Sequence, residues 1–240
     1  MNLINYIKNK QGFVHFSIDD AWRIFDKKSV AFKFLESLYN DFGLVTTLYI
    51  FTEPQGKKYL HKIPSNHLKD YHWLKFGPHA PDWEHPLNTL NIKEQLAHMD
   101  YTYKQLTRIV GKTNLAENVR LHTYKGSKEV CVDLAKRGIK TLFTQDFWDN
   151  RTSYCLPPKS RNNLNKQGFY KEAGLKINFI KTGLRVEEKP NIRKDALADF
   201  KHHNFEVFFT HEEFLGDPKI QARIKNVLRT AKEKGIKLVY

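Results

Sequence analysis

Runs of apolar residues along the chain alternate with stretches in which apolar positions recur every three or four residues. The apolar runs, rich in β-branched and aromatic side chains, predict strands, and the amphipathic stretches predict helices. Strands are expected at residues 13–18, 44–51, 73–76, 118–122, 139–144, 205–210 and 236–240, and helices at residues 30–42, 91–110, 127–137 and 220–235. Gly111 and Gly138 directly follow two of these helices, where a glycine C-cap is favoured.

This order of strands and helices is typical of an α/β fold. Strands that alternate with helices favour a parallel sheet with the helices packed outside it. Two stretches, at about residues 52–71 and 150–194, interrupt the alternation, and neither is apolar enough to form its own core. The second reads as short extended pieces at residues 176–180 and 184–186. We therefore predict one barrel-like domain over residues 1–240 with two insertions.

The length and composition fit this fold and exclude other classes. A chain of 240 residues can form one large α/β barrel or two small domains, and an aromatic content of 13% is too high for a disordered chain. No apolar run approaches the roughly 20 residues that span a bilayer. The first ten residues lack the pattern of a secretory signal, and Cys131 and Cys155 are too few for a disulfide framework. We expect no transmembrane segment and a reduced, cytoplasmic setting.

The net charge adds two alternatives. A formal charge of +14 at pH 7 is consistent with binding to nucleic acid or another anionic polymer, and equally with a solvated basic surface. Lysines are spread over the whole chain without a block of five or six like charges, a pattern that favours the second explanation. No helix-turn-helix, finger or stacking motif is visible, so no nucleic-acid partner is expected.

Polar residues suited to metal binding or acid–base chemistry follow five of the predicted strands. They are Asp19 and Asp20 after the first strand, His79 and His85 after the third, His122 at the end of the fourth, Asp146 and Trp148 after the fifth, and His211 after the strand at 205–210. The carboxyl ends of the strands of a parallel barrel meet on one face, where active sites are built. The repeated pattern predicts a functional site on that face.

Each of these residues also has an ordinary structural explanation. One aspartate after a strand can cap a helix, but two adjacent aspartates resist joint ionisation unless partners or a cation neutralise them. Each histidine alone could be a polar loop residue, a core residue or the start of a helix. Asp146 and Trp148 could be a turn residue and a packed indole.

Together these residues resemble the motifs of the polysaccharide deacetylases of carbohydrate esterase family four, the NodB-like superfamily. That family has a strand ending in Thr-Phe-Asp-Asp-Gly, and residues 16–21, Phe-Ser-Ile-Asp-Asp-Ala, are similar. Its last motif is an apolar strand ending in Leu-x-His, similar to residues 207–211, and Asp146-Phe147-Trp148 resembles its acidic–aromatic motif. The similarity runs in order from about residue 13 to 215. It implies a distorted TIM-like (β/α)7 barrel.

The sequence departs from the family at the second and third motifs. The family's two metal-binding histidines lie four residues apart, whereas His79 and His85 lie six apart and cannot share one face of a helix. Residues 120–124, Arg-Leu-His-Thr-Tyr, stand where the family has an Arg-x-Pro-aromatic pattern. We take His122 as the third ligand beside Asp20 and His79, with His85 as the alternative. Such a set suits zinc with open positions for water and substrate.

The resemblance also implies a reaction, the metal-assisted hydrolysis of an N-acetyl or O-acetyl group on a sugar or polysaccharide. In it Asp19 is the general base and His211 the general acid, while Asp146 orients His211 and Arg120 keeps Asp19 ionised. Aromatic side chains would stack on sugar rings, the candidates being Trp22, Trp83, Tyr124 and Trp148.

The implied cofactor is a divalent metal ion, with zinc favoured, and the implied partner is a carbohydrate, with anionic and lipid-linked sugars among the options. The alternative is a non-catalytic or repurposed barrel that binds an anionic glycan or nucleic acid through its basic surface. The sequence leaves open the substrate, the metal and the oligomeric state.

Overall fold

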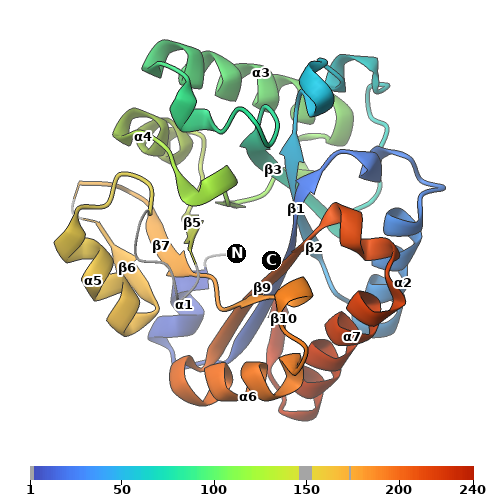
Figure 1. Cartoon of the computed structure of the whole chain (residues 1–240), viewed down its shortest axis with the longest axis vertical. Helices are drawn as coiled ribbons and strands as arrows, with labels where there is room; N and C mark the ends of the chain where they lie inside the picture. The colour runs from blue at the N-terminus through green and yellow to red at the C-terminus, as the bar shows by residue number, and fades with distance from the viewer. Residues whose placement is uncertain (1–2, 146–152, 173) are drawn as a thin grey trace.

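The computed structural model describes residues 3–145, 153–172 and 174–240, in which strands lie at the centre and helices form an outer ring (Figure 1). The strands are β1 (Phe13–Ala21), β2 (Thr46–Phe51), β3 (Leu74–Ala80), β4 (Asn118–Val119), β5 (Thr141–Thr144), β6 (Phe169–Lys171), β7 (Asn178–Lys181), β8 (Leu184–Arg185), β9 (Phe205–His211) and β10 (Lys237–Val239). The helices are α1 (Leu3–Lys8), α2 (Val30–Phe42), α3 (Ile92–Val110), α4 (Lys128–Lys136), α5 (Pro158–Gln167), α6 (Ile192–His203) and α7 (Pro218–Glu233).

The strands form two mainly parallel sheets. The first has the order β3-β2-β1-β9-β8, with β10 also paired to β1, and the second has the order β4-β5-β7-β6. Only β6 and β7 pair in the antiparallel sense among the described strands. A bridge between Phe76 and Leu115 lies where β3 of the first sheet meets the chain entering β4 of the second. The predicted alternation of strands and helices thus produces a parallel α/β architecture.

Strand β1 is the central element of the first sheet. It pairs with β2, β9 and β10, and all of its side chains except that of Asp20 are buried. A strand covered on both faces needs apolar side chains on both, which is why its sequence reads as a nearly continuous apolar run. Helix α2 packs Leu35 and Leu38 into the core on one side, and α7 contributes Ile224 and Leu228 to the same cluster.

Several predicted helix boundaries are confirmed by their caps. Helix α2 begins after Ser29, whose side chain accepts the backbone N–H of Phe32. Helix α3 begins with a capping box between Asn91 and Glu94 and ends at Gly111. Side-chain caps of this kind satisfy backbone groups that have no partner inside the helix, so they fix where each helix starts.

Part of the predicted insertion at residues 150–194 belongs to the sheets themselves. Strand β7 pairs with β5, and β8 pairs with β9. Helices α5 and α6 were not predicted. In α5 only Ser160 and Leu164 are buried, which leaves no clear apolar period.

The strand ends also differ from the prediction in ways that matter for the site. Strand β3 extends to Ala80, so His79 lies on a strand and not in a loop. Strand β4 stops at Val119, and the chain turns at residues 122–124, where Thr123 and Tyr124 have positive φ. The carboxyl ends of β1, β3 and β9, and the turn after β4, therefore carry the predicted site residues. Within the described ranges, no helix is long and apolar enough to cross a bilayer.

Candidate metal centre and active site

The end of β1 positions two adjacent carboxylates through an irregular backbone. The pairing of β1 with β2 shifts register between Ile18 and Ala21, and Asp20 adopts a φ of 55°. Such a conformation is uncommon outside glycine, although aspartate tolerates it better than most residues, and bulges of this kind redirect side chains next to functional sites. The irregularity allows Asp19 to reach Arg120 while Asp20 reaches the histidines at the end of the strands.

Asp20, His79 and His122 form a compact group of metal-binding atoms. One ligand atom from each lies within 4.8 Å of the other two. Oδ1 of Asp20 is 3.1 Å from Nε2 of His79 and 3.6 Å from Nδ1 of His122. One carboxylate and two imidazoles make a donor set that zinc and similar divalent metals accept. These are the three residues that the sequence resemblance assigned to the metal.

The hydrogen bond of His79 tests whether this group fits a metal. Its Nδ1 lies 2.6 Å from the backbone carbonyl oxygen of Arg120, which can only accept, so Nδ1 carries the proton. In the neutral ring, Nε2 then presents a lone pair to the carboxylate of Asp20. Two lone pairs at this distance repel unless a proton or a metal cation lies between them, and a metal-binding histidine is oriented in this way by a carbonyl partner. The residues fit a divalent metal.

The same histidines lower the pKa of Asp20. Burial raises this pKa, but the hydrogen bonds that His122 and His79 donate when protonated, together with the charges of His79 and His211, outweigh burial and hold it well below its usual range. Asp20 is therefore an anion at every working pH, as a metal ligand must be.

Asp19 and Arg120 form a buried ion pair beside this group. An Nη of Arg120 donates to Oδ1 of Asp19 at 2.9 Å and to Ser17 at 2.8 Å, and the second Nη donates to Thr182 at 3.2 Å. Burial lowers the pKa of Arg120, but the charge of Asp19, the hydrogen bond to it and the nearby Tyr124 and Tyr49 together raise this pKa above its usual value. The guanidinium also lies 4.3 Å from the ring centroid of Phe209. Arg120 is thus a fixed cation that neutralises Asp19.

His211 has a partner that the sequence did not indicate. Its Nδ1 lies 2.5 Å from Oε1 of Glu187, and its Nε2 faces Oδ2 of Asp20 at 3.9 Å. Thr210 donates to the other oxygen of Glu187 at 2.7 Å. Burial alone would lower the pKa of His211, but the bond to Glu187 and the charges of Asp19 and Asp20 raise it. The protonated imidazolium is favoured.

Glu187 is correspondingly held as an anion. Burial raises its pKa, but His211, Arg185 and Thr210 lower it to about 2. The predicted partner of His211, Asp146, and the predicted stacking residue Trp148 both lie outside the described residues. The sequence predicted only the short extended stretch at 184–186 that ends directly before Glu187, and it gave no sign that this glutamate would face His211.

His85 lies apart from the metal-binding group. Its side chain is 60% exposed, and its Nδ1 bonds to the carboxylate of Asp82 at 3.0 Å. This arrangement favours His122 over His85 as the third ligand. Tyr124 is the last residue of the turn that carries His122, and it is half-buried.

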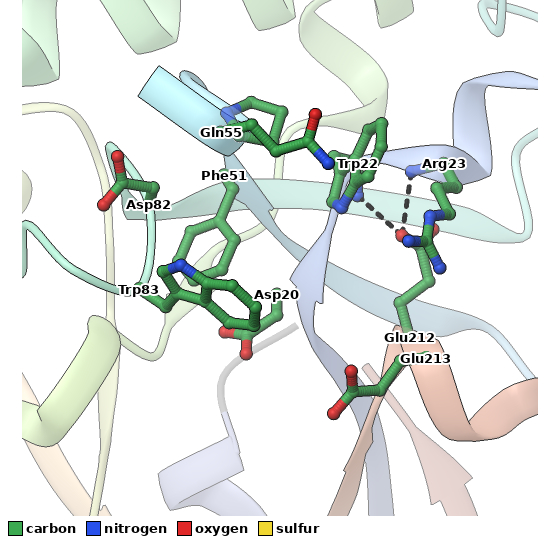
Figure 2. A pocket seen from close by; sticks show the side chains of 10 residues that line it. Asp20, Trp22, Arg23, Phe51, Gln55, Asp82, Trp83, Glu212 and Glu213 are labelled. Atoms are coloured by element: carbon green, nitrogen blue, oxygen red, sulfur yellow. Dashed lines mark hydrogen bonds between the residues drawn. The ribbon is translucent and has the colours of Figure 1, made fainter. Parts of the chain in front are cut away.

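A cavity of about 100 Å³ opens beside Asp20 (Figure 2). Its lining includes Phe51 and two of the three tryptophans predicted to bind sugar rings, Trp22 and Trp83, the second of which is 62% exposed. An exposed indole at the rim of a cavity is free to contact a ligand through its apolar face.

Glu212 shapes one side of this cavity. Its Oε2 accepts the backbone N–H groups of Trp22 at 2.9 Å and Arg23 at 2.8 Å, so it holds the tryptophan in place. Burial raises the pKa of Glu212, although these N–H groups oppose the change. The sequence contained no signal that this glutamate would bind the main chain after β1.

The fold of this chain is shared by known proteins, at low sequence identity. No family model and no curated protein sequence matches the chain. Solved structures do. A chitin deacetylase from Colletotrichum lindemuthianum aligns with a TM-score of 0.52 and 13% identity, over 95% of this chain and 85% of that one. A protein from Mycobacterium smegmatis described as a polysaccharide deacetylase aligns with a TM-score of 0.59 and 11% identity, over 92% and 83%.

These matches confirm the predicted fold class, a distorted TIM-like (β/α)7 barrel, which the chain shares with the solved deacetylase structures. A 4-α-glucanotransferase from Thermococcus litoralis also aligns, with a TM-score of 0.56 and 15% identity, over 95% of this chain and 37% of that one. Proteins with different named activities therefore share this fold, and the activity of this chain has to be argued from its site.

Proposed function

We propose that the chain is a metal-dependent hydrolase that removes an acetyl group from an N-acetylated or O-acetylated sugar. One observation carries the proposal. The group of Asp20, His79 and His122 lies between a buried Asp19–Arg120 pair and a His211–Glu187 pair. This arrangement supports metal-assisted hydrolysis because it combines a cation site with a carboxylate base and a charged imidazole acid.

Asp20, His79 and His122 would hold a divalent metal, with zinc favoured. When bound, such a metal polarises a carbonyl oxygen and lowers the pKa of water. Asp19 would accept a proton from the water that attacks the acetyl carbonyl. Arg120 fixes the carboxylate of Asp19 through Oδ1, so its other oxygen is available for the proton.

His211 would act as the general acid. Glu187 holds the imidazole through Nδ1, which leaves Nε2 to donate a proton to the departing amine or alkoxide. The charges around Asp19 and His211 explain why the first is the base and the second the acid. A carboxylate paired with a buried arginine is suited to accept a proton, whereas an imidazole surrounded by carboxylates is suited to give one.

The cavity beside Asp20 supports a neutral sugar as substrate. Its lining contains the acidic residues Asp20, Asp82, Glu212 and Glu213 and a single cationic side chain, Arg23. Negative charge at the site disfavours anionic sugars, although the chain as a whole carries a net +14. Trp22 and Trp83 would stack against the sugar ring.

The test is acetate release from N-acetylglucosamine oligomers and from an O-acetylated xylan, with the protein loaded with Zn²⁺ or Co²⁺. We expect release by the wild type and a loss of about 100-fold or more in Asp19→Asn, which should still bind the metal. Asp26→Asn, at an exposed position, is the matched control and should keep full activity. Unchanged release in Asp19→Asn, or no release with any divalent metal, would overturn the proposal.

A further inference from the structure

Cys131 and Cys155, the two cysteines of the chain, lie next to each other in the fold. Their sulfur atoms are 3.6 Å apart, although 24 positions separate them in sequence. Cys131 is fully buried on α4, and Cys155 is half-buried just before α5. A buried thiol in direct contact with an accessible one is the arrangement in which a mixed disulfide on the second can be resolved by the first.

The two thiols differ in their readiness to ionise. The hydrogen bond with Cys131 lowers the pKa of Cys155, and Lys128 acts in the same direction. The hydrogen bond with Cys155 and burial raise the pKa of Cys131. Because the thiolate is the reacting form, the more accessible cysteine is also the more nucleophilic one.

Tyr154 connects this pair to the candidate active site. Its hydroxyl accepts the backbone N–H of Leu121 at 3.0 Å and donates to the carbonyl of Phe143 at 2.9 Å. Its own backbone N–H donates to the carbonyl of Tyr124 at 2.7 Å. These bonds hold both ends of the turn that carries His122.

We propose that Cys131 and Cys155 are a modification site, where a low-molecular-weight disulfide such as oxidised glutathione produces a reversible intramolecular disulfide. The Cys155 thiolate attacks one sulfur of the small disulfide, forms a mixed disulfide and expels one thiolate. The Cys131 thiolate then attacks Sγ of Cys155 and expels the second. Two electrons pass from the cysteine sulfurs to the small disulfide, and the two cysteine protons end on the two released thiols.

The bond restrains the segment that supports the His122 turn. It joins α4 covalently to the residue next to Tyr154, so the contacts of Tyr154 with Leu121 and Tyr124 open less often. A covalent link between distant parts of the chain also restricts the unfolded state. The oxidised protein should therefore be the more stable form, with a more rigid turn.

The chemistry is tested by counting thiols after treatment with oxidised glutathione. We expect the wild type to pass from two free thiols to none, with a mass lower by two hydrogen atoms, and to recover both thiols in dithiothreitol. Cys131→Ser should stop as a stable mixed disulfide on Cys155, whereas Cys155→Ser should keep its buried thiol. A wild type that retains both thiols, stops at the mixed disulfide or forms a covalent dimer would overturn the proposal.

The connection to the turn is tested by amide hydrogen exchange, which depends on neither metal nor activity. Exchange of the Leu121 amide should slow several-fold on oxidation of the wild type and remain unchanged in Cys131→Ser treated in the same way. The amide of Leu48 in β2 is an internal control. Equal exchange of Leu121 in the oxidised and reduced wild type would show that the disulfide does not restrain the turn. Failure of the deacetylase proposal would leave both measurements unaffected.

Discussion

The backbone carbonyl oxygen of Arg120 lies 2.6 Å from Nδ1 of His79, while the side chain of the same arginine binds Asp19. One residue therefore sets the tautomer of a candidate metal ligand and neutralises the candidate base. Arg120 follows β4 directly, and its side chain is fully buried among aromatic rings. The metal-binding group and the acid–base pair are coupled through this position.

Replacing Arg120 with leucine should destabilise the protein strongly. The change leaves the carboxylate of Asp19 buried without its cation, and loss of one partner of a buried ion pair typically costs about 3–5 kcal/mol. The double variant Asp19→Asn/Arg120→Leu should recover part of this loss, because the neutral amide needs no counter-charge. Urea unfolding of the two single variants and the double variant measures the coupling. If Arg120→Leu and the double variant lost the same free energy of unfolding, Asp19 and Arg120 would not be coupled.

The third metal ligand is distinguished by comparing two histidine variants. His122→Ala should lower zinc affinity by more than about 100-fold, since the change removes a ligand and not merely a supporting contact. His85→Ala should bind zinc as the wild type does, because His85 points to Asp82 and is mostly exposed. Calorimetric titration with Zn²⁺ measures both. If His85→Ala lost zinc affinity and His122→Ala kept it, His85 would be the third ligand.

Glu187→Gln should shift the pH dependence of activity. Glu187 raises the pKa of His211, so its neutralisation lowers that pKa. An acid that must be protonated loses activity as pH rises through its pKa, and the alkaline limb of the profile should therefore move to lower pH, by roughly one unit.

Glu188→Gln is the matched control for this change. Glu188 is 53% exposed and contacts Arg185 through an ion pair of 3.0 Å, without touching His211. Its profile should overlie that of the wild type. If the alkaline limb of the Glu187→Gln profile stayed in place, Glu187 would not be the residue that sets the pKa of the general acid.

Much of this site could be predicted from the sequence because its residues follow apolar strands. Asp19, Asp20 and His211 come directly at the ends of β1 and β9, where alternation and burial fix the position of each residue. His79 and His122 were placed on the correct edge for the same reason.

The partners of these residues were harder to predict. Glu187 and Glu212 contact the site through the turns that follow β8 and β9, and no local pattern specifies which side chain a turn will direct inward. The positive φ of Asp20 could not be predicted either. A glycine at this position would have indicated a bulge, but an aspartate does not. Helix α5 was missed because only Ser160 and Leu164 of its residues are buried. Helix α6 was missed although its buried residues Ile192, Ala196 and Phe200 recur every four positions.

His15 should make stability depend on pH. Burial, together with the charge of Arg120, lowers its pKa from 6.5 to about 3. Between these values the unfolded chain binds a proton that the folded chain does not, so this contribution is complete above pH 6.5 and is lost as the pH falls towards 3.

The free energy of unfolding should therefore decrease below pH 6.5, by at most about 1.4 kcal/mol per pH unit from this residue. Burial also lowers the pKa values of His98 and His203, each to about 4. These two histidines therefore also reduce the free energy of unfolding as the pH falls. His15→Phe keeps the ring packed near Phe143 and should flatten the slope. His61→Phe, at an exposed position, should leave it unchanged. An equal slope in both variants would contradict the assignment.

The backbone conformation of Asp20 should lower the stability of the fold, whereas its carboxylate is needed to bind the metal. Its φ of 55° is unfavourable for a residue with a side chain, whereas glycine adopts it readily. In the absence of metal, Asp20→Gly should be more stable than Asp20→Ala by about 1 kcal/mol, and both should lose the metal because both lose the carboxylate. Thermal unfolding of the metal-free variants, with zinc titration of each, provides the measurement. If Asp20→Ala proved at least as stable as Asp20→Gly, the strained backbone at this ligand would be excluded.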